Sequence, residues 1–181
     1  MSVSSDVELV RALTESRRLG FLGARPIGEV IEHARAFVVA LDHVPADSRV
    51  LDLGSGGGVP GLVIAHDRPD LRMVLLDRRT KRTDFLRRVV HRLQWSDRVE
   101  VIADDVGALL AGEPESFDAV VARGFGPPEL TLSTAARLVR PNGVIVISEP
   151  PSGDRWRTET MAALGTDRLT GSAGVAVFRR R

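Results

Sequence analysis

The fold is indicated by one stretch of the chain, which reads Val50-Leu51-Asp52-Leu53-Gly54-Ser55-Gly56-Gly57-Gly58. Its first half is mostly apolar and is typical of a buried β-strand, whereas glycine dominates its second half. Because glycine has no Cβ, a glycine-rich loop after a strand can turn sharply and bring its backbone close to a ligand. Pro60 follows, and proline favours the first turn of a helix. The stretch therefore predicts a strand, a ligand-binding loop and a helix.

Short apolar runs alternate with helical stretches along the rest of the chain. After the first run at 50–51, further strands are expected at 73–76, 99–103, 119–122 and 144–147, and helices at 80–94, 127–140 and 154–164. The turn Pro141-Asn142-Gly143 is expected to end the helix at 127–140. Such alternation predicts an α/β fold, Rossmann-like, with a mostly parallel sheet and helices on both of its faces.

The two ends of the chain complete this prediction. Two helices at 6–18 and 28–42 form an N-terminal helical extension over residues 1–47, and the core covers 48–181 as part of a single domain. At the other end, 171–178 is expected to be a final strand that forms a hairpin with 166–170. An antiparallel closing pair is more typical of Rossmann-like methyltransferases than of dehydrogenases.

Composition excludes several classes of chemistry. The 181 residues include no cysteine, which excludes disulfides, thiolate metal sites and cysteine nucleophiles. The four histidines, His33, His43, His66 and His91, lack the spacing of metal ligands, so no metal is expected. The sequence shows neither a secretory signal nor an apolar run of the roughly 20 residues that a membrane span needs. We expect a cytoplasmic monomer that does not contact a membrane.

The glycine loop fits two ligand patterns. Gly54-x-Gly56-x-Gly58, with Asp52 at the strand end, is the pattern of S-adenosylmethionine enzymes. Gly56-x-Gly58-x-x-Gly61 instead satisfies the dinucleotide fingerprint. A dinucleotide loop needs its first glycine directly at the strand end, and Gly56 comes too late for that. We therefore expect S-adenosyl-L-methionine as the cofactor.

Aspartates follow the next two strands. Asp77 comes at the end of the second strand, where its carboxylate can accept hydrogen bonds from ribose hydroxyls of either cofactor. After the third strand, Asp104 or Asp105 can accept from an adenine amino group while Val106 lies against the ring. Helix capping is the alternative role for all three aspartates, and the sequence leaves it open.

Three segments now carry a family resemblance. They are Gly58-Val59-Pro60-Gly61, Leu76-Asp77-Arg78-Arg79-Thr80-Lys81-Arg82 and Val121-Ala122-Arg123-Gly124-Phe125. With them, the chain resembles the bacterial 16S ribosomal RNA guanine-N7 methyltransferases, also called glucose-inhibited division protein B, from about residue 25 onward. The resemblance implies a methyltransferase that acts on 16S rRNA or the small ribosomal subunit.

The loop pattern and the resemblance together give a set of site residues. The expected cofactor-binding residues are Asp52, Gly54, Ser55, Gly56, Gly58, Val59, Asp77, Arg78, Asp105, Val106 and Arg123. Arg123 stands just past the fourth strand, where it could hold the methionine carboxylate or an RNA phosphate and so orient the reactants. The alternative is that Arg123 is an exposed loop residue with no role in the site. No general base is expected, because guanine N7 attacks with a free lone pair and loses no proton.

Basic residues gather where RNA would have to bind. The candidate surface comprises Arg78, Arg79, Lys81, Arg82, Arg87, Arg88 and Arg92, with Arg17, Arg18 and Arg25 from the extension. Among these we expect Lys81, Arg82 and Arg88 to contact substrate, together with Glu149. A solvated charged face is the alternative for such a run.

Two segments depart from the family. Ser148-Glu149-Pro150-Pro151 stands where the family usually has Leu-Lys-Gly, and Gly20-Phe21-Leu22-Gly23 stands where it usually has Asn-Leu-Thr. The first departure replaces a cation near the substrate with an anion. Two other functions therefore stay open, namely a methyltransferase that acts on a small molecule or another RNA, and a cofactor-binding module without catalysis.

Overall fold

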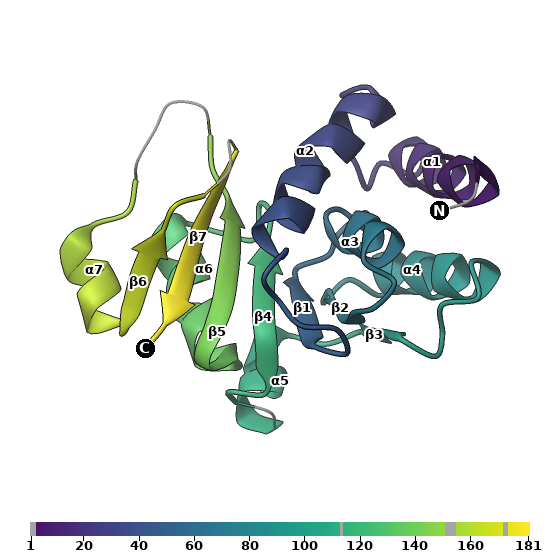
Figure 1. The fold of residues 1–181 in the computed structure, drawn as a ribbon. Helices are drawn as coiled ribbons and strands as arrows, with labels where there is room; N and C mark the ends of the chain where they lie inside the picture. The colour runs from purple at the N-terminus through teal and green to yellow at the C-terminus, as the bar shows by residue number, and fades with distance from the viewer. Residues whose placement is uncertain (1–2, 113, 151–154, 172–173) are drawn as a thin grey trace.

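The protein is built around one twisted sheet. The computed structural model describes residues 3–112, 114–150, 155–171 and 174–181, and within these ranges seven strands are ordered β3-β2-β1-β4-β5-β7-β6 (Figure 1). The strands are β1 (Arg49–Leu53), β2 (Arg72–Leu76), β3 (Val99–Ile102), β4 (Phe117–Ala122), β5 (Val139–Ser148), β6 (Thr166–Leu169) and β7 (Val175–Arg180). The first five strands pair in parallel, and β7 runs antiparallel to both of its neighbours. The predicted Rossmann-like fold class and its closing hairpin are confirmed.

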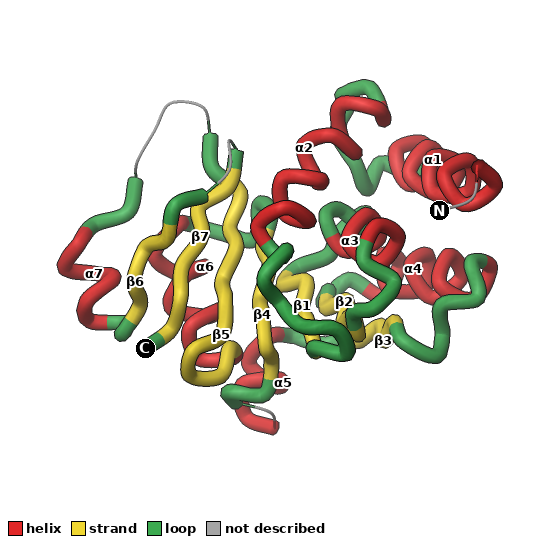
Figure 2. Tube along the Cα trace, in the orientation of Figure 1, coloured by secondary structure: helices red, strands yellow, loops and turns green. Residues whose placement is uncertain are grey.

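Helices cover both faces of this sheet. They are α1 (Val3–Arg18), α2 (Ile27–Ala40), α3 (Gly61–Asp67), α4 (Thr80–Arg92), α5 (Val106–Gly112), α6 (Pro128–Leu138) and α7 (Thr158–Ala163). In Figures 1 and 2, α2, α3 and α4 lie on one face, and α6 lies behind the strands. α3 and α4 connect parallel strands by the crossover that such a sheet requires.

Alternating strand side chains supply two hydrophobic cores. Val50 of β1 and Val121 of β4 belong to the cluster that also contains the buried side chains of α1–α4. Leu51 comes one position after Val50, and Val120 comes one position before Val121. Both belong to the cluster on the α5, α6 and α7 side. Burial of each such side chain contributes about 1.5–3 kcal/mol. Because both faces are buried, the central strands read as continuous apolar runs.

The N-terminal helices share the first of these cores. Leu9 and Leu13 of α1 and Phe37 of α2 are fully or almost fully buried, in the same cluster as the α3 side chains. On α3, the buried His66 ring lies with its Nε2 3.3 Å from a carboxylate oxygen of Asp6 on α1. The extension therefore packs closely on the sheet, and the boundary between residues 47 and 48 stays a prediction.

One predicted element boundary is wrong. The helix expected at 127–140 ends at Leu138, and the residues of the expected turn lie inside β5. Phe117 pairs with Val139, but Ala119 pairs with Val144, so β5 carries an irregularity between these pairs. Asn142 has a φ of 65°, which is the left-handed conformation that a turn needs. The Pro-Asn-Gly segment therefore does turn, but as a bulge of β5 beside β4 and not at the end of a helix.

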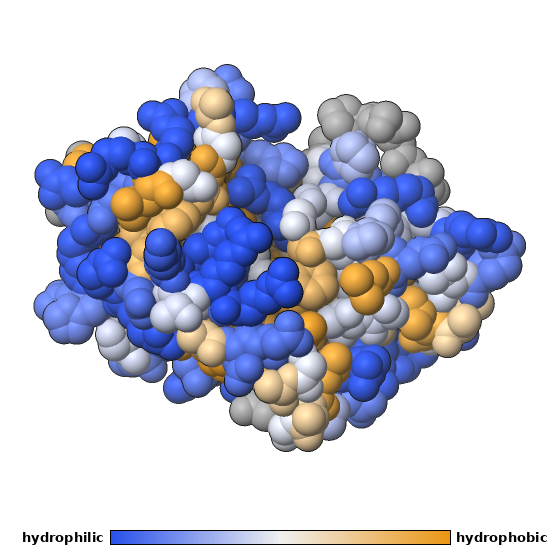
Figure 3. Space-filling view, turned by 180° about the vertical axis from the view of Figure 1, so that it is seen from behind, coloured by the Kyte–Doolittle hydropathy of each residue, from blue (hydrophilic) through white to orange (hydrophobic). Residues whose placement is uncertain are grey.

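Other boundaries shift by a few residues. The helix expected at 154–164 is α7, which begins at Thr158, and residue 154 lies outside the described ranges. The last strand extends to Arg180, and residues 172–173 of the expected strand also lie outside those ranges. No described helix is long and apolar enough to cross a membrane. Seen from behind, most of the surface is hydrophilic, with apolar side chains in separate areas (Figure 3).

Candidate functional site

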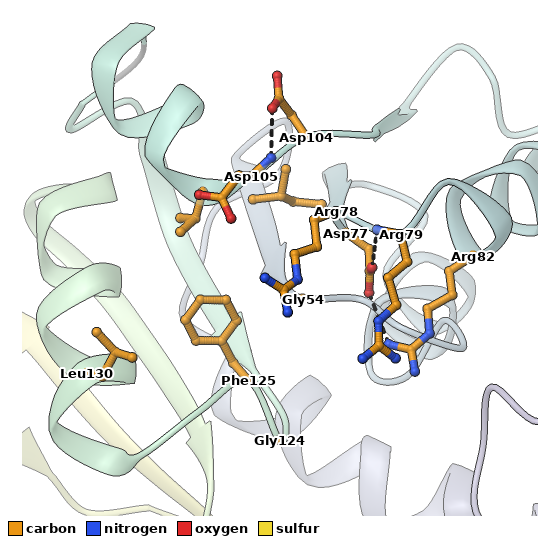
Figure 4. A pocket seen from close by; sticks show the side chains of 12 residues that line it. Gly54, Asp77, Arg78, Arg79, Arg82, Asp104, Asp105, Gly124, Phe125 and Leu130 are labelled. Carbon is orange, nitrogen blue, oxygen red and sulfur yellow. Dashed lines mark hydrogen bonds and ion pairs between the residues drawn. The ribbon is translucent and has the colours of Figure 1, made fainter.

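A cavity lies where β1, β2, β3 and β4 end. It has a volume of about 320 Å³ and is lined by Gly54, Leu76, Asp77, Arg78, Arg79, Arg82, Asp104, Asp105, Val106, Gly124, Phe125 and Leu130 (Figure 4). We call it the main cavity. β1 stands between β2 and β4, so the chain crosses to opposite sides of β1 at this point. Open α/β sheets bind ligands at such a switch point, outside the carboxyl ends of the strands.

The glycine loop borders the main cavity in a conformation that requires glycine. Gly54, Gly56 and Gly58 have φ angles of 76°, 55° and 95°. A Cβ on Gly54 would lie 2.9 Å from the Phe125 ring, and one on Gly58 would lie 2.4 Å from Leu62. The positive φ angles and the close packing both disfavour any side chain. The loop thus presents bare backbone next to the cavity, as its sequence predicts.

Asp77 joins this loop to the start of α4. Its Oδ2 accepts a hydrogen bond from the Gly56 N–H at 2.9 Å, and its Oδ1 accepts one from the Arg79 N–H at 2.8 Å. The Arg82 guanidinium lies 3.4 Å from the same Oδ2. Oδ2 thus has two donors, whereas Oδ1 can accept one further hydrogen bond, and Asp77 lines the cavity. Asp77 therefore has both a local structural role and acceptor capacity that faces the cavity.

Asp52 lies buried below the loop, near enough to the partly buried Arg123 for each to influence the other's pKa. Asp52 is fully buried, its Oδ2 accepts from the Gly61 N–H at 3.0 Å, and its Oδ1 has no hydrogen-bond partner within the described chain. Burial raises the pKa of Asp52 to about 7, although its hydrogen bonds and the Arg123 charge oppose this rise. Burial lowers the pKa of Arg123, and the Asp52 charge opposes that change. Among the described residues, Arg123 makes no hydrogen bond or ion pair.

The aspartates after β3 hydrogen-bond to the start of the next helix, and they also lie at the main cavity. The Gly107 N–H donates to Asp105 Oδ1 at 2.9 Å, and the Asp105 N–H donates to Asp104 Oδ1 at 2.7 Å. These contacts order the start of α5. Asp104, Asp105 and Val106 are among the residues that line the main cavity. In Figure 4 the Asp105 carboxylate points toward the cavity, so it offers an acceptor beside an apolar side chain.

Only some of the predicted cofactor-binding residues line the main cavity. Gly54, Asp77, Arg78, Asp105 and Val106 line it. The other predicted cofactor residues do not, and they are Asp52, Ser55, Gly56, Gly58, Val59 and Arg123. Ser55 is buried and donates to the Asp52 carbonyl, while Val59 packs in the hydrophobic core. These two support the loop from behind, and their predicted contact with a cofactor stays a prediction.

Two lining residues escaped the sequence reasoning about the site. Phe125 follows β4 and points into the main cavity, opposite Arg78 in Figure 4. Leu130 stands in the first turn of α6, with 54% of its surface exposed. The sequence gives no separate signal for Leu130, because an apolar residue on a helix usually indicates core. Phe125 belongs to a segment that carries the family resemblance, but the pattern of that segment predicts no cavity contact for its ring.

The four predicted substrate residues lie in different places. Arg82 lines the main cavity, Lys81 lines a neighbouring cavity, and Arg88 is exposed on α4. Glu149 lines neither cavity. Its carboxylate accepts from Trp156 Nε1 at 2.8 Å and pairs with Arg168 at 3.1 Å, which accounts for a carboxylate at this position. No group of His, Asp and Glu suited to a metal occurs in the described residues.

Comparison with known protein families shows which family this chain belongs to. Residues 7–159 match the family described as rRNA small subunit methyltransferase G. The chain belongs to the rRNA small subunit methyltransferase G family. The family model spans the N-terminal helices, the glycine loop and the main cavity. The resemblance inferred from the three sequence segments is thereby confirmed.

Individual relatives agree with this assignment. The chain is 34% identical to the ribosomal RNA small subunit methyltransferase G of Frankia casuarinae, over 80% of this chain and 55% of the relative. It is 34% identical to the Salinispora arenicola protein of the same name, over 85% of this chain and 65% of the relative. The chain thus spans little more than half to about two thirds of the length of these relatives.

Solved structures share the fold at low sequence identity. A SAM-dependent methyltransferase from Thiobacillus denitrificans, in complex with S-adenosyl-L-homocysteine, gives a TM-score of 0.59 at 21% identity, over 82% of this chain and 74% of that chain. A precorrin-6y methyltransferase from Geobacter metallireducens gives a TM-score of 0.58 at 18% identity, over 80% of this chain and 85% of that chain. These similarities bear on the fold alone.

Proposed function

We propose that this protein is an S-adenosyl-L-methionine-dependent methyltransferase that methylates N7 of a guanine in 16S rRNA. The observation that carries the proposal is the main cavity, in which a glycine loop and the acceptors Asp77 and Asp105 meet at the strand ends. Family membership supports the same activity. The protein acts on the small ribosomal subunit or its RNA, in the cytoplasm and as a monomer.

The residues present fit the proposed cofactor. Asp77 Oδ1 can accept from a ribose hydroxyl, and Asp105 with Val106 suits the adenine. Asp52 and Arg123 lie behind the cavity wall, and we propose that they act on the amino acid end of the cofactor, since an unpaired carboxylate oxygen and an unpaired guanidinium among the described residues complement an ammonium and a carboxylate.

The protein needs to contribute mainly orientation. The cofactor, when bound, supplies an electrophilic methyl group on its sulfonium. Guanine N7 carries its own lone pair and loses no proton, so no residue has to act as a general base. Phe125 and the Gly54 backbone border the cavity on one side and Arg78 on another, which restricts how reactants can lie. Such positioning can account for a large part of the rate of a bimolecular transfer.

Positive charge beside the main cavity favours RNA over a small metabolite. The three arginines in the lining are matched by three aspartates, but Lys81 and Arg88 add further cations on α4. RNA phosphates that these cations neutralise would release counterions, so affinity should fall steeply as salt rises. A small uncharged substrate would show almost no salt dependence.

Two linked measurements test this function. Calorimetry should detect saturable binding of S-adenosyl-L-methionine and none of NAD. Radiolabelled methyl groups should then pass from the cofactor to purified small subunits or 16S rRNA from cells that lack the gene. Label in small metabolites and none in RNA would favour the small-molecule alternative. Cofactor binding without transfer to any acceptor would favour a non-catalytic module.

A further inference from the structure

A second cavity lies beside the main one. It has a volume of about 410 Å³ and is lined by residues 19–21, after α1, and 79–82, at the start of α4. We call it the flanking cavity. Arg79 and Arg82 line both cavities, so the two are neighbours with a shared wall. A ligand long enough to leave the main cavity past these arginines can enter the flanking one.

The flanking cavity has a cationic wall. Arg79, Lys81 and Arg82 contribute to the lining, and none of the described lining residues is acidic. Among the described residues, the side chains of Arg79 and Lys81 form no ion pair, while Arg82 has the 3.4 Å contact with Asp77. Arg17 and Arg18, both exposed, directly precede the lining segment. This charge selects an anionic ligand.

The opposite wall is apolar and includes an aromatic ring. Leu19 is 41% exposed, although it is a large hydrophobic side chain. Phe21 is partly buried and packs edge-on against Phe85 of α4, with 5.7 Å between ring centroids. That contact holds the ring at the cavity. Aromatic rings next to cations are the combination that binds single-stranded nucleic acid, because bases stack on the rings while phosphates meet the charges.

We propose that the flanking cavity binds a nucleotide of single-stranded RNA that is a neighbour, along the strand, of the guanine entering the main cavity. The inference rests on the proposed function. Phe21 and Leu19 contact the base, and Lys81 and Arg79 contact its phosphates. The volume suits one nucleotide, since small-ligand sites are about 300–1,000 Å³. The protein would thereby select for a guanine with an unpaired neighbour.

Variants of the 181-residue chain test the two walls separately. Phe21→Leu removes the ring while keeping the charge, and we expect it to weaken binding of a short single-stranded RNA that contains guanine by about tenfold. Phe21→Tyr keeps the ring and should bind as the native protein does. Lys81→Gln should lower the exponent of the salt dependence by roughly 0.7, the value for one single-strand phosphate contact. Arg137→Gln, an exposed arginine on α6, serves as the control for charge and should leave both quantities unchanged.

Further readouts keep this inference separate from the proposed function. Each variant should bind S-adenosyl-L-methionine as the native protein does. Phe21→Tyr, Lys81→Gln and Arg137→Gln should also melt as the native protein does, whereas Phe21→Leu should melt a few degrees lower because it loses the ring contact with Phe85. Ultraviolet crosslinking of the same RNA should label the peptide that contains residues 19–21. The inference is overturned if native protein methylates rRNA while Phe21→Leu and Phe21→Tyr bind the RNA equally. It is also overturned if duplex RNA, inorganic polyphosphate or an acidic peptide competes as well as single-stranded RNA.

Discussion

The Ser16 hydroxyl donates a hydrogen bond to the Gly57 carbonyl, across 41 residues of sequence and at 2.8 Å. Ser16 belongs to α1 and is fully buried, and Gly57 lies in the middle of the glycine loop. A Cβ on Gly57 would approach both Ser16 and Leu22 to within 2.7 Å. The N-terminal extension therefore holds the loop in place and is part of the site's framework.

Loss of this hydrogen bond should loosen the loop. Ser16→Ala leaves a buried carbonyl without its donor, so we expect a stability loss of about 1 kcal/mol and weaker cofactor binding. Thr14→Ala is the matched control, because Thr14 is exposed and bonds only to its own helix at the Val10 carbonyl. Chemical denaturation and calorimetry measure both effects. Equal cofactor affinity in the two variants would show that α1 does not support the loop.

Cofactor binding should require that the backbone at Gly56 comes close to the cofactor. Gly56→Val forces a β-branched residue to a φ of 55°, which costs roughly 1–3 kcal/mol. Gly165→Val is the control, since Gly165 has a φ of 61°, has open space around it and lies between α7 and β6. Both variants should melt at similarly lowered temperatures. Only Gly56→Val should lose cofactor binding, and retention of full affinity there would refute the assigned role of the loop.

Arg123 should matter for function more than for stability. Its guanidinium makes no hydrogen bond or ion pair within the described chain, so Arg123→Ala removes little that holds the fold together. We expect melting temperatures within a few degrees of the native value and a sharp fall in cofactor affinity or turnover. Arg123→Lys keeps the charge but not the planar fork, and should be intermediate. Native turnover in Arg123→Ala would leave the residue without a role in the site.

Asp52 should make the ligand-free protein less stable as pH rises. Its pKa of about 7 lies above the unfolded value of 3.8, so the folded state holds a proton that the unfolded state releases between these two pH values. Stability therefore falls from about pH 4 to pH 7, by roughly 1.4 kcal/mol for each unit of pKa shift, and levels off above it. Asp52→Asn, which keeps an acceptor for Gly61, should lack this component. The raised pKa would be contradicted if the free energies of unfolding of the native protein and of Asp52→Asn changed in parallel from pH 4 to pH 8.

Local signals in the sequence were sufficient for much of the fold and part of the site. The glycine loop and Asp77 could be predicted because each directly follows a strand in the sequence, and parallel strands bring their carboxyl ends together. Leu130 was missed because an apolar residue on a helix usually signals core. Contacts such as that of Ser16 with Gly57, or of Glu149 with Trp156, depend on tertiary packing that no spacing encodes.

In the proposed function, this protein transfers a methyl group from S-adenosyl-L-methionine to guanine N7 in 16S rRNA. The most direct test incubates small subunits from a strain without the gene with the protein and labelled cofactor, and then maps the label by nuclease digestion and mass spectrometry. We predict label in a single guanine, at N7, and none with Gly56→Val. Saturable cofactor binding with no label in the RNA, or label on another atom of the base, would contradict the account.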